Sequence, residues 1–399
     1  MKKIPVHQPS EPETSAVTKR FALWDLGFRP FYLLAGLFGA FSILLWAAQH
    51  SGLLTHAYLQ GPVWHGHEML FGYTTAVISG FLLTAVRVWT KEPTPSGRLL
   101  MLLVMIWICG RILVLTPFFM TAAIINAAFP ISVALAISIP LLRSGNVRNY
   151  FFIGLLVLMG VLIFVVHLSL QGYINLPASI GLQLGSDVVL FIMVVIGGRV
   201  IPMFTNNGVP GINAIRNPII EKFALGTVIL LFAADLLQLP QNLIAIIGLI
   251  SAIAHGMRWL LWKPWQTLKV PLVWILHVAY AWIVVHLLLR SLSASELLIS
   301  SYAIHALTVG AIGGLTLGMM TRTARGHTGR PLIADKFEVT MYLLIQAGAF
   351  IRVFGGIVSQ GLYMTSIQLS ALLWSAAFSL FVFRYWPVLI RPRIDGKPL

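Results

Sequence analysis

Charged residues and cysteine are both scarce in this sequence of 399 residues, and each scarcity excludes a class of protein. Only 10% of the residues are charged, whereas a soluble domain has about 25%. With 58% hydrophobic residues, the composition excludes a water-soluble globule. The one cysteine, Cys109, lies in an apolar run, so neither a disulfide framework nor a thiolate metal site is expected. The composition therefore predicts a membrane protein.

Long apolar runs without strict alternation fill most of the chain. A helix needs about 20 apolar residues to cross the bilayer core, whereas a transmembrane β-barrel shows short alternating segments. The pattern predicts an all-α, polytopic membrane bundle of about twelve transmembrane helices. Their expected ranges are 31–49, 67–88, 99–115, 118–141, 150–170, 178–201, 221–238, 241–262, 271–289, 296–320, 337–358 and 362–385. The transmembrane domain, 29–386, is flanked by tails at 1–28 and 387–399.

The positions of the basic residues predict the orientation of the chain. Of the 27 Lys and Arg residues, all but Arg111, Arg290 and Arg352 fall in segments on one side. Because Lys and Arg concentrate in cytoplasmic segments, we expect both termini in the cytoplasm. The first 28 residues lack the apolar core of a signal peptide, so we expect a cytoplasmic tail. The same bias accounts for the net charge of +15, so no nucleic-acid partner is expected.

Three similar segments recur at near-equal intervals in the second, sixth and tenth expected spans. They are ISGFLLTAVRVWT from Ile78, IGGRVIPMFT from Ile196 and IGGLTLGMMT from Ile312. Such a repeat indicates three units of four helices, although small residues also recur because they allow close helix packing. Three four-helix arcs resemble the catalytic subunit of haem–copper oxidases, in which haem lies between histidines of helices two and ten. The histidines that bind copper in that family have no counterpart in the sixth and seventh spans.

Histidines inside the spans are the candidate metal ligands, because ionisable groups in a membrane are costly and each suggests a function. His65 and His67 begin the second span, and on a helix they point in different directions. His305 lies deeper, about nine residues into the tenth span. We expect His67 and His305 to ligate a haem, although this difference in depth requires helix tilt or a shifted boundary. The alternative for each is a hydrogen bond that supports packing.

Other buried ionisable groups give further candidates. His277 and His255 lie at similar depth in adjacent spans and form a candidate second ligand pair, with His167 and His286 ranked lower. Asp187 and Asp235 lie in the sixth and seventh spans, and either pair with Arg111 and Arg352 or form a proton or ion path. The segment TRTARGHTGRPL after the tenth span is a candidate site for a haem propionate, a lipid phosphate or a partner. Alternatively, these basic residues bind no ligand and only reflect the usual excess of Lys and Arg in cytoplasmic segments.

The sequence resembles the NnrS family of bacterial inner-membrane proteins over nearly all of the spans. The motifs that carry the resemblance are FRPFYLLAG from Phe28, WHGHEMLFGY from Trp64, GFLLTA from Gly80, GRVIPMFTNNG from Gly198, LHVAYAW from Leu276, and HALTVGAIGGLTLGMMTRTARGHTGRPL from His305. The resemblance implies haem, with copper as a further metal, and a role in denitrification or protection from nitrosative stress. The site residues it implies are His65, His67, His277, His305 and His327, with Arg199 and Arg322, while Arg330 is a candidate through the basic segment after the tenth span.

The leading functional prediction is a membrane protein with one or two b-type haems that binds, senses or detoxifies nitric oxide or a nitrosylated species. A b-type haem is expected because the chain has no C-x-x-C-H attachment motif. One alternative is a haem-free transporter or channel that binds its substrate near Asp187 and Asp235. A second is an oxidoreductase resembling nitric oxide reductases. The sequence identifies neither a reaction nor a redox partner.

Overall fold

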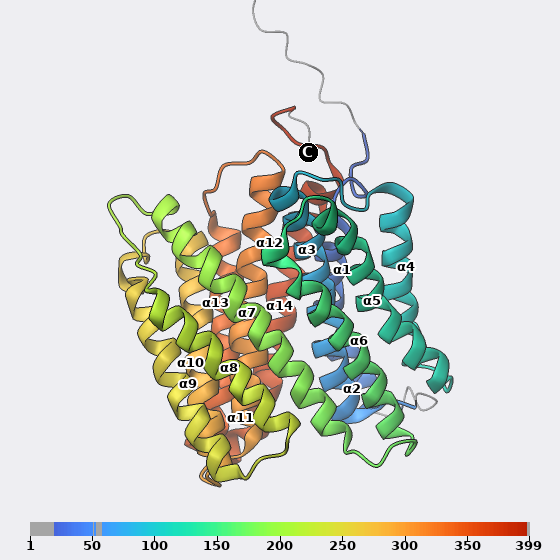
Figure 1. Ribbon diagram of the computed structural model, residues 1–399, viewed down its shortest axis with the longest axis vertical. Coiled ribbons are helices and arrows are strands. Elements are labelled where there is room, and N and C mark those ends of the chain that lie inside the picture. Colours follow the sequence, from blue (N-terminus) through green and yellow to red (C-terminus); the bar gives the residue numbers. More distant parts are fainter. Residues whose placement is uncertain (1–19, 51, 53–57, 397–399) are drawn as a thin grey trace, which may run out of the picture.

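The computed structural model describes residues 20–50, 52 and 58–396, and this part of the chain is built from helices (Figure 1). Residues 1–19 of the predicted N-terminal tail and the last three residues lie outside it. The long helices are α1 (Phe28–His50), α4 (Gly97–Leu113), α5 (Phe119–Arg143), α6 (Phe151–Leu170), α7 (Ala178–Gly208), α8 (Pro218–Leu236), α9 (Gln241–Leu261), α10 (Pro271–Ala294), α13 (Lys336–Val358) and α14 (Tyr363–Ile390).

Each of these ten helices forms one continuous rod, and two further rods each consist of three consecutive helical segments. The first joins α2 (Gly61–His67), the π-helix η1 (Glu68–Thr74) and α3 (Thr75–Thr90). The second joins α11 (Ser300–His305), the π-helix η4 (Ala306–Gly313) and α12 (Gly314–His327). Short 3-10 turns complete the described structure at Val147–Asn149, Pro264–Gln266 and Gln360–Leu362.

Each expected span coincides with one rod, so the prediction of a polytopic all-helical bundle is confirmed. Ten rods are long and apolar enough to cross a membrane. The other two are α4, which has 17 residues, and α8, which carries Glu221, Lys222 and Asp235. The C-terminal helix continues past the predicted domain end at 386 and reaches Ile390.

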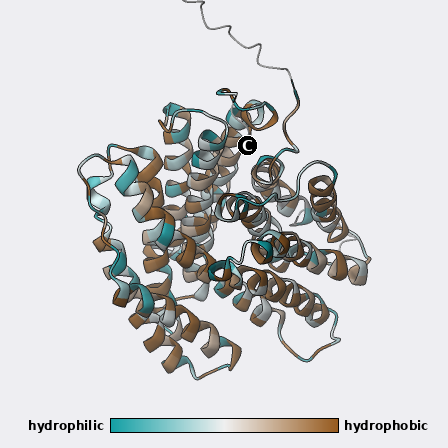
Figure 2. Cartoon of the chain, turned by 45° about the horizontal axis from the view of Figure 1, so that its top comes forward, coloured by the Kyte–Doolittle hydropathy of each residue, from teal (hydrophilic) through white to brown (hydrophobic). Residues whose placement is uncertain are grey.

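Many large apolar side chains are exposed on the outside of the bundle, and hydrophobic residues predominate along most of its helices (Figure 2). Leu102, Leu135, Ile246 and Phe383 are each more than half exposed, on four different helices. A soluble monomer rarely exposes apolar surface on this scale, whereas acyl chains would cover it in a bilayer. The exposed surface therefore supports a multi-pass membrane protein.

The first and last helices pack side by side and bring the chain ends to one side of the bundle. The Ala22 N–H donates to the Ile390 carbonyl oxygen over 2.8 Å. Nη1 of Arg29 donates to the carbonyl oxygens of Leu389 (2.8 Å) and Arg391 (2.6 Å). We call this the terminal side and the opposite one the distal side. Both ends of the described chain thus lie on the same side, and the cytoplasmic assignment of that side stays a prediction.

The observed boundaries place His67 and His305 at similar depths. The rod that carries His67 begins at Gly61 rather than at 67, and the rod that carries His305 begins at Ser300 rather than at 296. The segment before the π-helix has 7 residues in the first rod and 6 in the second, and the two histidines end these segments. The expected difference in depth is therefore not found.

Candidate distal site

The predicted site residues divide between the two sides of the bundle. His65, His67 and His305 lie near the distal side, with the lower-ranked His167 and His286. The terminal half holds the other predicted residues, which are His255, His277, Arg199, Arg322, His327 and Arg330. The structure therefore brings the predicted residues together as two sets rather than one.

The first distal cluster surrounds His67, whose side chain is fully buried. Its Nδ1 lies 2.8 Å from Oε1 of Glu68, and the same oxygen lies 3.0 Å from Nη1 of Arg111 on α4. Arg111 in turn donates to Oδ1 of Asn126 on α5. The ring of His167 on α6 packs against that of His67, with centroids 4.7 Å apart. Hydrogen bonds and one ring contact thus tie α2, α4, α5 and α6 together.

The second distal cluster contains His65, His305 and Arg352 of α13. Nδ1 of His305 lies 2.7 Å from the carbonyl oxygen of Ser301, and its Nε2 lies 3.3 Å from Nη2 of Arg352. His65 is close enough to His305 to interact with it electrostatically. The structure therefore packs His67 against His167 and gives His305 contacts with Ser301 and Arg352, and the joint ligation of a haem by His67 and His305 stays a prediction.

The two aspartates of the spans share one guanidinium. Nη1 of Arg290 on α10 donates to Oδ1 of Asp187 over 2.7 Å, and its Nη2 donates to Oδ2 of Asp235. Gln183 also donates to Oδ1 of Asp187, over 3.1 Å. The expected ion pairing of these aspartates is observed, but the partner is Arg290. When all three groups are ionised, this set has one negative charge in excess.

Arg352 differs from the other two exceptions to the positive-inside pattern. Arg111 has a carboxylate partner in Glu68, and Arg290 has two. In the described part of the chain no ion pair joins Arg352 to a carboxylate. Its Nη2 lies 3.2 Å from Oγ of Ser301, and its Nη1 is buried without a hydrogen-bond partner. The second cluster therefore carries an uncompensated positive charge.

Both distal clusters adjoin a π-helix. The segment η1 begins directly after His67, and η4 begins directly after His305. π-Helical turns are rare and frequently mark functional sites. The two segments pack against each other, and the Tyr73 hydroxyl at the end of η1 lies 2.7 Å from that of Thr316. The second and tenth spans thus share a distortion at matching positions, which supports the relation between them that the repeat predicts.

Several buried imidazoles keep one ring nitrogen without a hydrogen-bond partner. In the described residues these atoms are Nδ1 of His65, Nε2 of His67, Nε2 of His167, Nδ1 of His277 and Nε2 of His286. Leaving a buried polar atom unpaired costs about 1–3 kcal/mol, so each such atom indicates a water, an ion or a ligand. Four of the five belong to the distal set. In the part of the chain that the structure describes, no group of three or more His, Cys, Asp or Glu side chains is placed to hold one metal ion.

The two candidate histidines of the terminal half differ in their hydrogen bonding. Nε2 of His277 lies 2.7 Å from Oγ1 of Thr205, which leaves its Nδ1 free. His255 uses both nitrogens, since Nδ1 lies 2.7 Å from the Tyr280 hydroxyl and Nε2 lies 3.1 Å from the Ala224 carbonyl oxygen. A histidine with both nitrogens engaged has no lone pair for a metal, so the contacts of His255 match the packing alternative.

The predicted arginines of the terminal half contact aromatic rings and amides. Arg199 donates to Oδ1 of Asn149 over 2.7 Å. The guanidinium carbon of Arg322 lies 3.9 Å from the centroid of the Phe204 ring, a cation–π contact. These contacts hold both side chains without any ligand.

The segment that follows the tenth span has mixed roles. Arg325 donates to Oε1 of Glu338 on α13 over 2.7 Å, and the ring of His327 packs on Phe28 with centroids 5.6 Å apart. Nη1 of Arg330 is buried without a partner in the described chain. Within the segment TRTARGHTGRPL, the candidate site for a propionate or a phosphate, Arg330 thus has a buried N–H donor without a partner.

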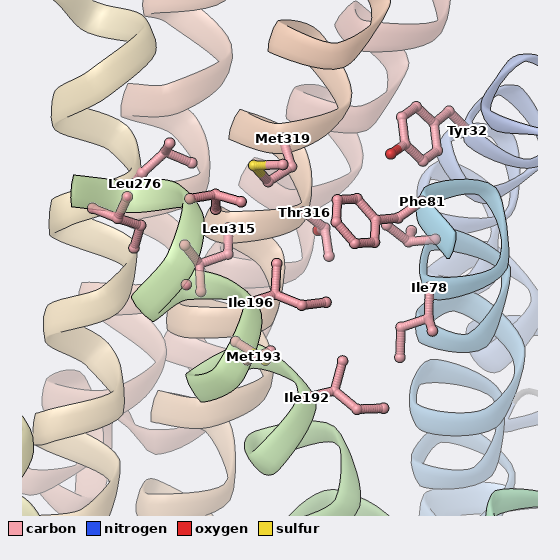
Figure 3. Close-up of a pocket in the computed structure, with 14 residues that line it drawn as sticks. Tyr32, Ile78, Phe81, Ile192, Met193, Ile196, Leu276, Leu315, Thr316 and Met319 are labelled. Carbon is pink, nitrogen blue, oxygen red and sulfur yellow. The ribbon is translucent and has the colours of Figure 1, made fainter. Parts of the chain in front are cut away.

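A pocket lies between α1, α3, α7, α10 and α12, and all three repeat segments contribute to its lining (Figure 3). The first contributes Ile78 and Phe81, the second Ile196, and the third Thr316 and Met319. The space in it that is open to a water-sized molecule is about 80 Å³. Its lining is almost entirely apolar and contains no histidine. The cavity therefore suits a small uncharged molecule, whereas imidazole ligation of a metal is confined to other parts of the described structure.

Sequence reasoning missed two members of the first cluster, Tyr58 and Asn126. Tyr58 lies outside the helices, and its hydroxyl lies 2.6 Å from Nδ1 of His167. No local pattern marks it, because only the packing of the loop against α6 gives it a partner. The ion pair between Glu68 and Arg111 does have a signature in the sequence. Glu68 is an acidic residue beside His67 in an expected span, and Arg111 is a basic residue that does not follow the positive-inside pattern.

Comparison with known proteins adds one finding to this geometry. No curated protein matches the chain significantly. A family model described as NnrS protein matches residues 22–393, which is nearly the whole chain. The motifs that contain His65, His67, His277 and His305 fall within the matched region. The chain therefore belongs to the NnrS family.

Proposed function

We propose that this protein is a haem-binding protein of the bacterial inner membrane that binds, senses or detoxifies nitric oxide or a nitrosylated species. Membership of the NnrS family supports the link with nitric oxide. The observation that supports the haem assignment is the second distal cluster, in which a buried arginine without a carboxylate partner in the described chain contacts the imidazole of His305.

The residues of this cluster fit the needs of a b-type haem. An axial histidine is usually neutral, and an acceptor that binds its second nitrogen fixes the tautomer. The carbonyl oxygen of Ser301 does this for His305, and Nε2, which lies 3.3 Å from Nη2 of Arg352, would exchange that contact for the iron. His65 supplies a second ring with an unpartnered nitrogen. Arg352 offers a buried N–H donor and an uncompensated charge, which a haem propionate would neutralise.

Within this proposal each residue has a defined role. His305 would hold the iron, with His65 as the alternative ligand, and Arg352 would bind a propionate. A haem bound there would supply an iron that coordinates nitric oxide. The apolar cavity between Ile78, Ile196 and Met319 favours the entry of a small uncharged molecule from the bilayer and disfavours ions.

An absorption spectrum of the purified protein tests the proposal. The full chain is expressed with ample haem, purified in detergent, and analysed for iron and for a Soret band. We expect stoichiometric iron, and a Soret band that shifts when nitric oxide is added. The variants His305→Ala and Arg352→Gln should lose or alter the band, because the first removes the ligand and the second the propionate partner.

The matched control is His255→Gln, since His255 is a buried histidine of α9 in the terminal half, away from the second distal cluster. This variant should keep the wild-type band. Folded protein without iron or a Soret band would overturn the proposal and favour the haem-free transporter. A band that is unchanged in His305→Ala would overturn the ligand assignment. Turnover of nitric oxide by the isolated protein would instead move the protein to the oxidoreductases.

A further inference from the structure

We propose that Arg29 and Arg330 form a binding site for a phosphate group on the terminal side of the bundle. The phosphate belongs either to a lipid headgroup or to a free phosphate ion. The side chain of Arg29, at the start of α1, is fully buried, and its Nε and Nη2 atoms have no hydrogen-bond partner in the described chain. The site does not depend on the proposed haem, which would lie near the distal side.

The hydrogen bonds of Nη1 fix the position of the Arg29 guanidinium. This nitrogen donates to the carbonyl oxygens of Leu389 and Arg391, at the end of α14. Because a guanidinium is planar and rigid, the Nε and Nη2 N–H groups then point in parallel along one edge. Such an edge is the fork that binds two oxygens of a carboxylate or a phosphate. Arg29 therefore presents an oriented fork that no acceptor of the described chain contacts.

Two other buried arginines of this chain show what the same arrangement binds. Arg258 donates from Nη1 to a backbone carbonyl oxygen, and its Nε and Nη2 donate to the carboxylate of Glu221 over 2.9 and 2.6 Å. Arg325 also donates from Nη1 to a backbone carbonyl oxygen, and its Nε and Nη2 donate to Oε1 of Glu338 over 3.1 and 2.7 Å. The equivalent edge of Arg29 thus indicates an oxyanion ligand.

The carboxylates nearest to this site are paired with other arginines. Asp25 is near enough to attract Arg29 electrostatically, but its ion pair is with Arg20, over 2.6 Å. The carboxylate of the C-terminal segment pairs with Arg393, also over 2.6 Å. Within the described ranges, no ion pair joins a carboxylate to Arg29 or to Arg330. The two guanidiniums therefore carry two positive charges that are not compensated by an ion pair.

Arg330 is near Arg29 because the loop after α12 packs against the end of the chain. The Ile394 N–H donates to the Thr328 carbonyl oxygen over 3.1 Å, which joins this loop to the segment that holds Arg29. The two arginines are near enough to repel each other electrostatically, and Nη1 of Arg330 is also buried without a partner. An anion in contact with both would replace this repulsion by attraction and accept hydrogen bonds from the unpaired donors.

The number of donors and the charge favour a phosphate over a carboxylate. A carboxylate would use both of its oxygens on the fork of Arg29. A tetrahedral phosphate binds the same fork with two oxygens and retains others for Arg330, and a phosphate monoester carries a charge of about −1.5 to −2. Arginine is the usual residue for such bidentate phosphate contacts. A site at the end of the membrane-spanning helices is also where a headgroup phosphate would lie.

Binding of inorganic phosphate by the full chain tests this site. The protein is purified in detergent and washed free of lipid, and its thermal unfolding is followed while phosphate replaces chloride at constant ionic strength. We expect a saturable rise in the melting temperature, because a ligand that binds only the folded protein stabilises it. Arg330→Gln should weaken binding by about 10–100-fold, since it removes a charge-assisted hydrogen bond. Arg29→Lys should weaken it similarly, because it keeps the charge but loses the fork.

The matched control is Arg98→Gln, which removes an exposed arginine beside Gly97, whose N–H donates to the Trp24 carbonyl oxygen on the same side. It lowers the net charge as Arg330→Gln does, and it should bind phosphate like the wild type. Equal weakening in these two variants would show an unspecific effect of charge and would overturn the site. If Arg29→Lys fails to fold, Arg330→Gln still decides, because Nη1 of Arg330 has no partner to lose in the described chain.

Adding phosphatidylglycerol to the micelles distinguishes the two sources of phosphate. If the lipid raises the melting temperature of the wild type and removes the effect of phosphate, the ligand is a headgroup. If phosphate acts equally with and without the lipid, the ligand is the free ion. If neither stabilises the folded wild type, the fork is filled by water or by an acidic group of the chain itself, and the proposal is overturned.

This outcome is separable from that of the proposed function. Phosphate binding that depends on Arg330, in a protein without a Soret band, would support this site and refute the haem. A Soret band that is lost in His305→Ala, in a protein that responds to neither phosphate nor phosphatidylglycerol, would do the reverse.

Discussion

Replacing Arg258 should destabilise the protein far more than replacing Arg216, although both arginines bind the same carboxylate. Arg258 donates to the two oxygens of Glu221, over 2.9 Å from Nε and 2.6 Å from Nη2. Its Nη1 also donates to the Val194 carbonyl oxygen and the Tyr280 hydroxyl, each over 3.0 Å. Arg216 lies 3.4 Å from Oε2 of Glu221. The side chain of Arg258 is 2% exposed, and that of Arg216 is 46% exposed.

The expected magnitudes follow from this difference in burial. Removing one partner of a buried ion pair costs about 3–5 kcal/mol, because the other partner is left without its counter-charge. An exposed pair contributes about 0–1 kcal/mol. We therefore expect Arg258→Gln to lower the free energy of unfolding by about 3–5 kcal/mol. Arg216→Gln should lower it by less than about 1 kcal/mol.

Gly198 gives an independent way to disturb the same guanidinium. A Cβ atom at Gly198 would overlap the Arg258 guanidinium, so Gly198→Ala must displace that group while every charge is retained. We expect this variant to be destabilised in the same direction as Arg258→Gln. Titration with SDS in mixed micelles, followed by circular dichroism, measures the free energy of unfolding. Equal losses for the Arg258 and Arg216 variants would refute the reasoning from burial.

Two further predictions concern the orientation of the chain and its response to pH. A fluorescent reporter joined after Leu399 should fold in the cytoplasm, while one inserted at Tyr173 in a distal loop should not; the opposite pattern would reverse the orientation. Hydrogen bonding with Glu338, and then with the Phe337 N–H and Arg384, lowers the pKa of Asp335 to about 2. Since the pKa of Asp335 is lower in the folded protein than in the unfolded chain, its stabilising effect is complete above about pH 4 and is lost toward pH 2. In acid unfolding experiments, the variant Asp335→Asn should not show this loss.

The sequence was sufficient to predict the helices because each needs only a long apolar run. It placed all twelve rods, and its main errors were boundaries such as that at Gly61, where Pro62 and Trp64 begin the helix before the apolar stretch. The partners of the histidines could not be predicted in the same way. Which imidazole faces His67 depends on the rotation of α6 and on the two π-helical segments, and neither has a clear signature in one sequence.

Charge was the stronger guide within the candidate site. The three arginines that break the positive-inside pattern, Arg111, Arg290 and Arg352, all lie near the distal clusters. The sequence identified them as exceptions but could not choose their partners, because the aspartates on α7 and α8 could have paired with any of the three. Packing decides the matter by placing Arg290 of α10 against both helices.

The contact between the first and last helices has a consequence for how the protein is made. A chain that enters the membrane from its N-terminus presents α1 long before α14 exists, so the side of α1 that contacts α14 stays uncovered until synthesis ends. The pair His67 and His167 is complete once α6 has been inserted, whereas His65 gains His305 only after α11. The two histidine pairs are therefore assembled in a fixed order during biogenesis, and the bundle closes around them when α14 docks against α1.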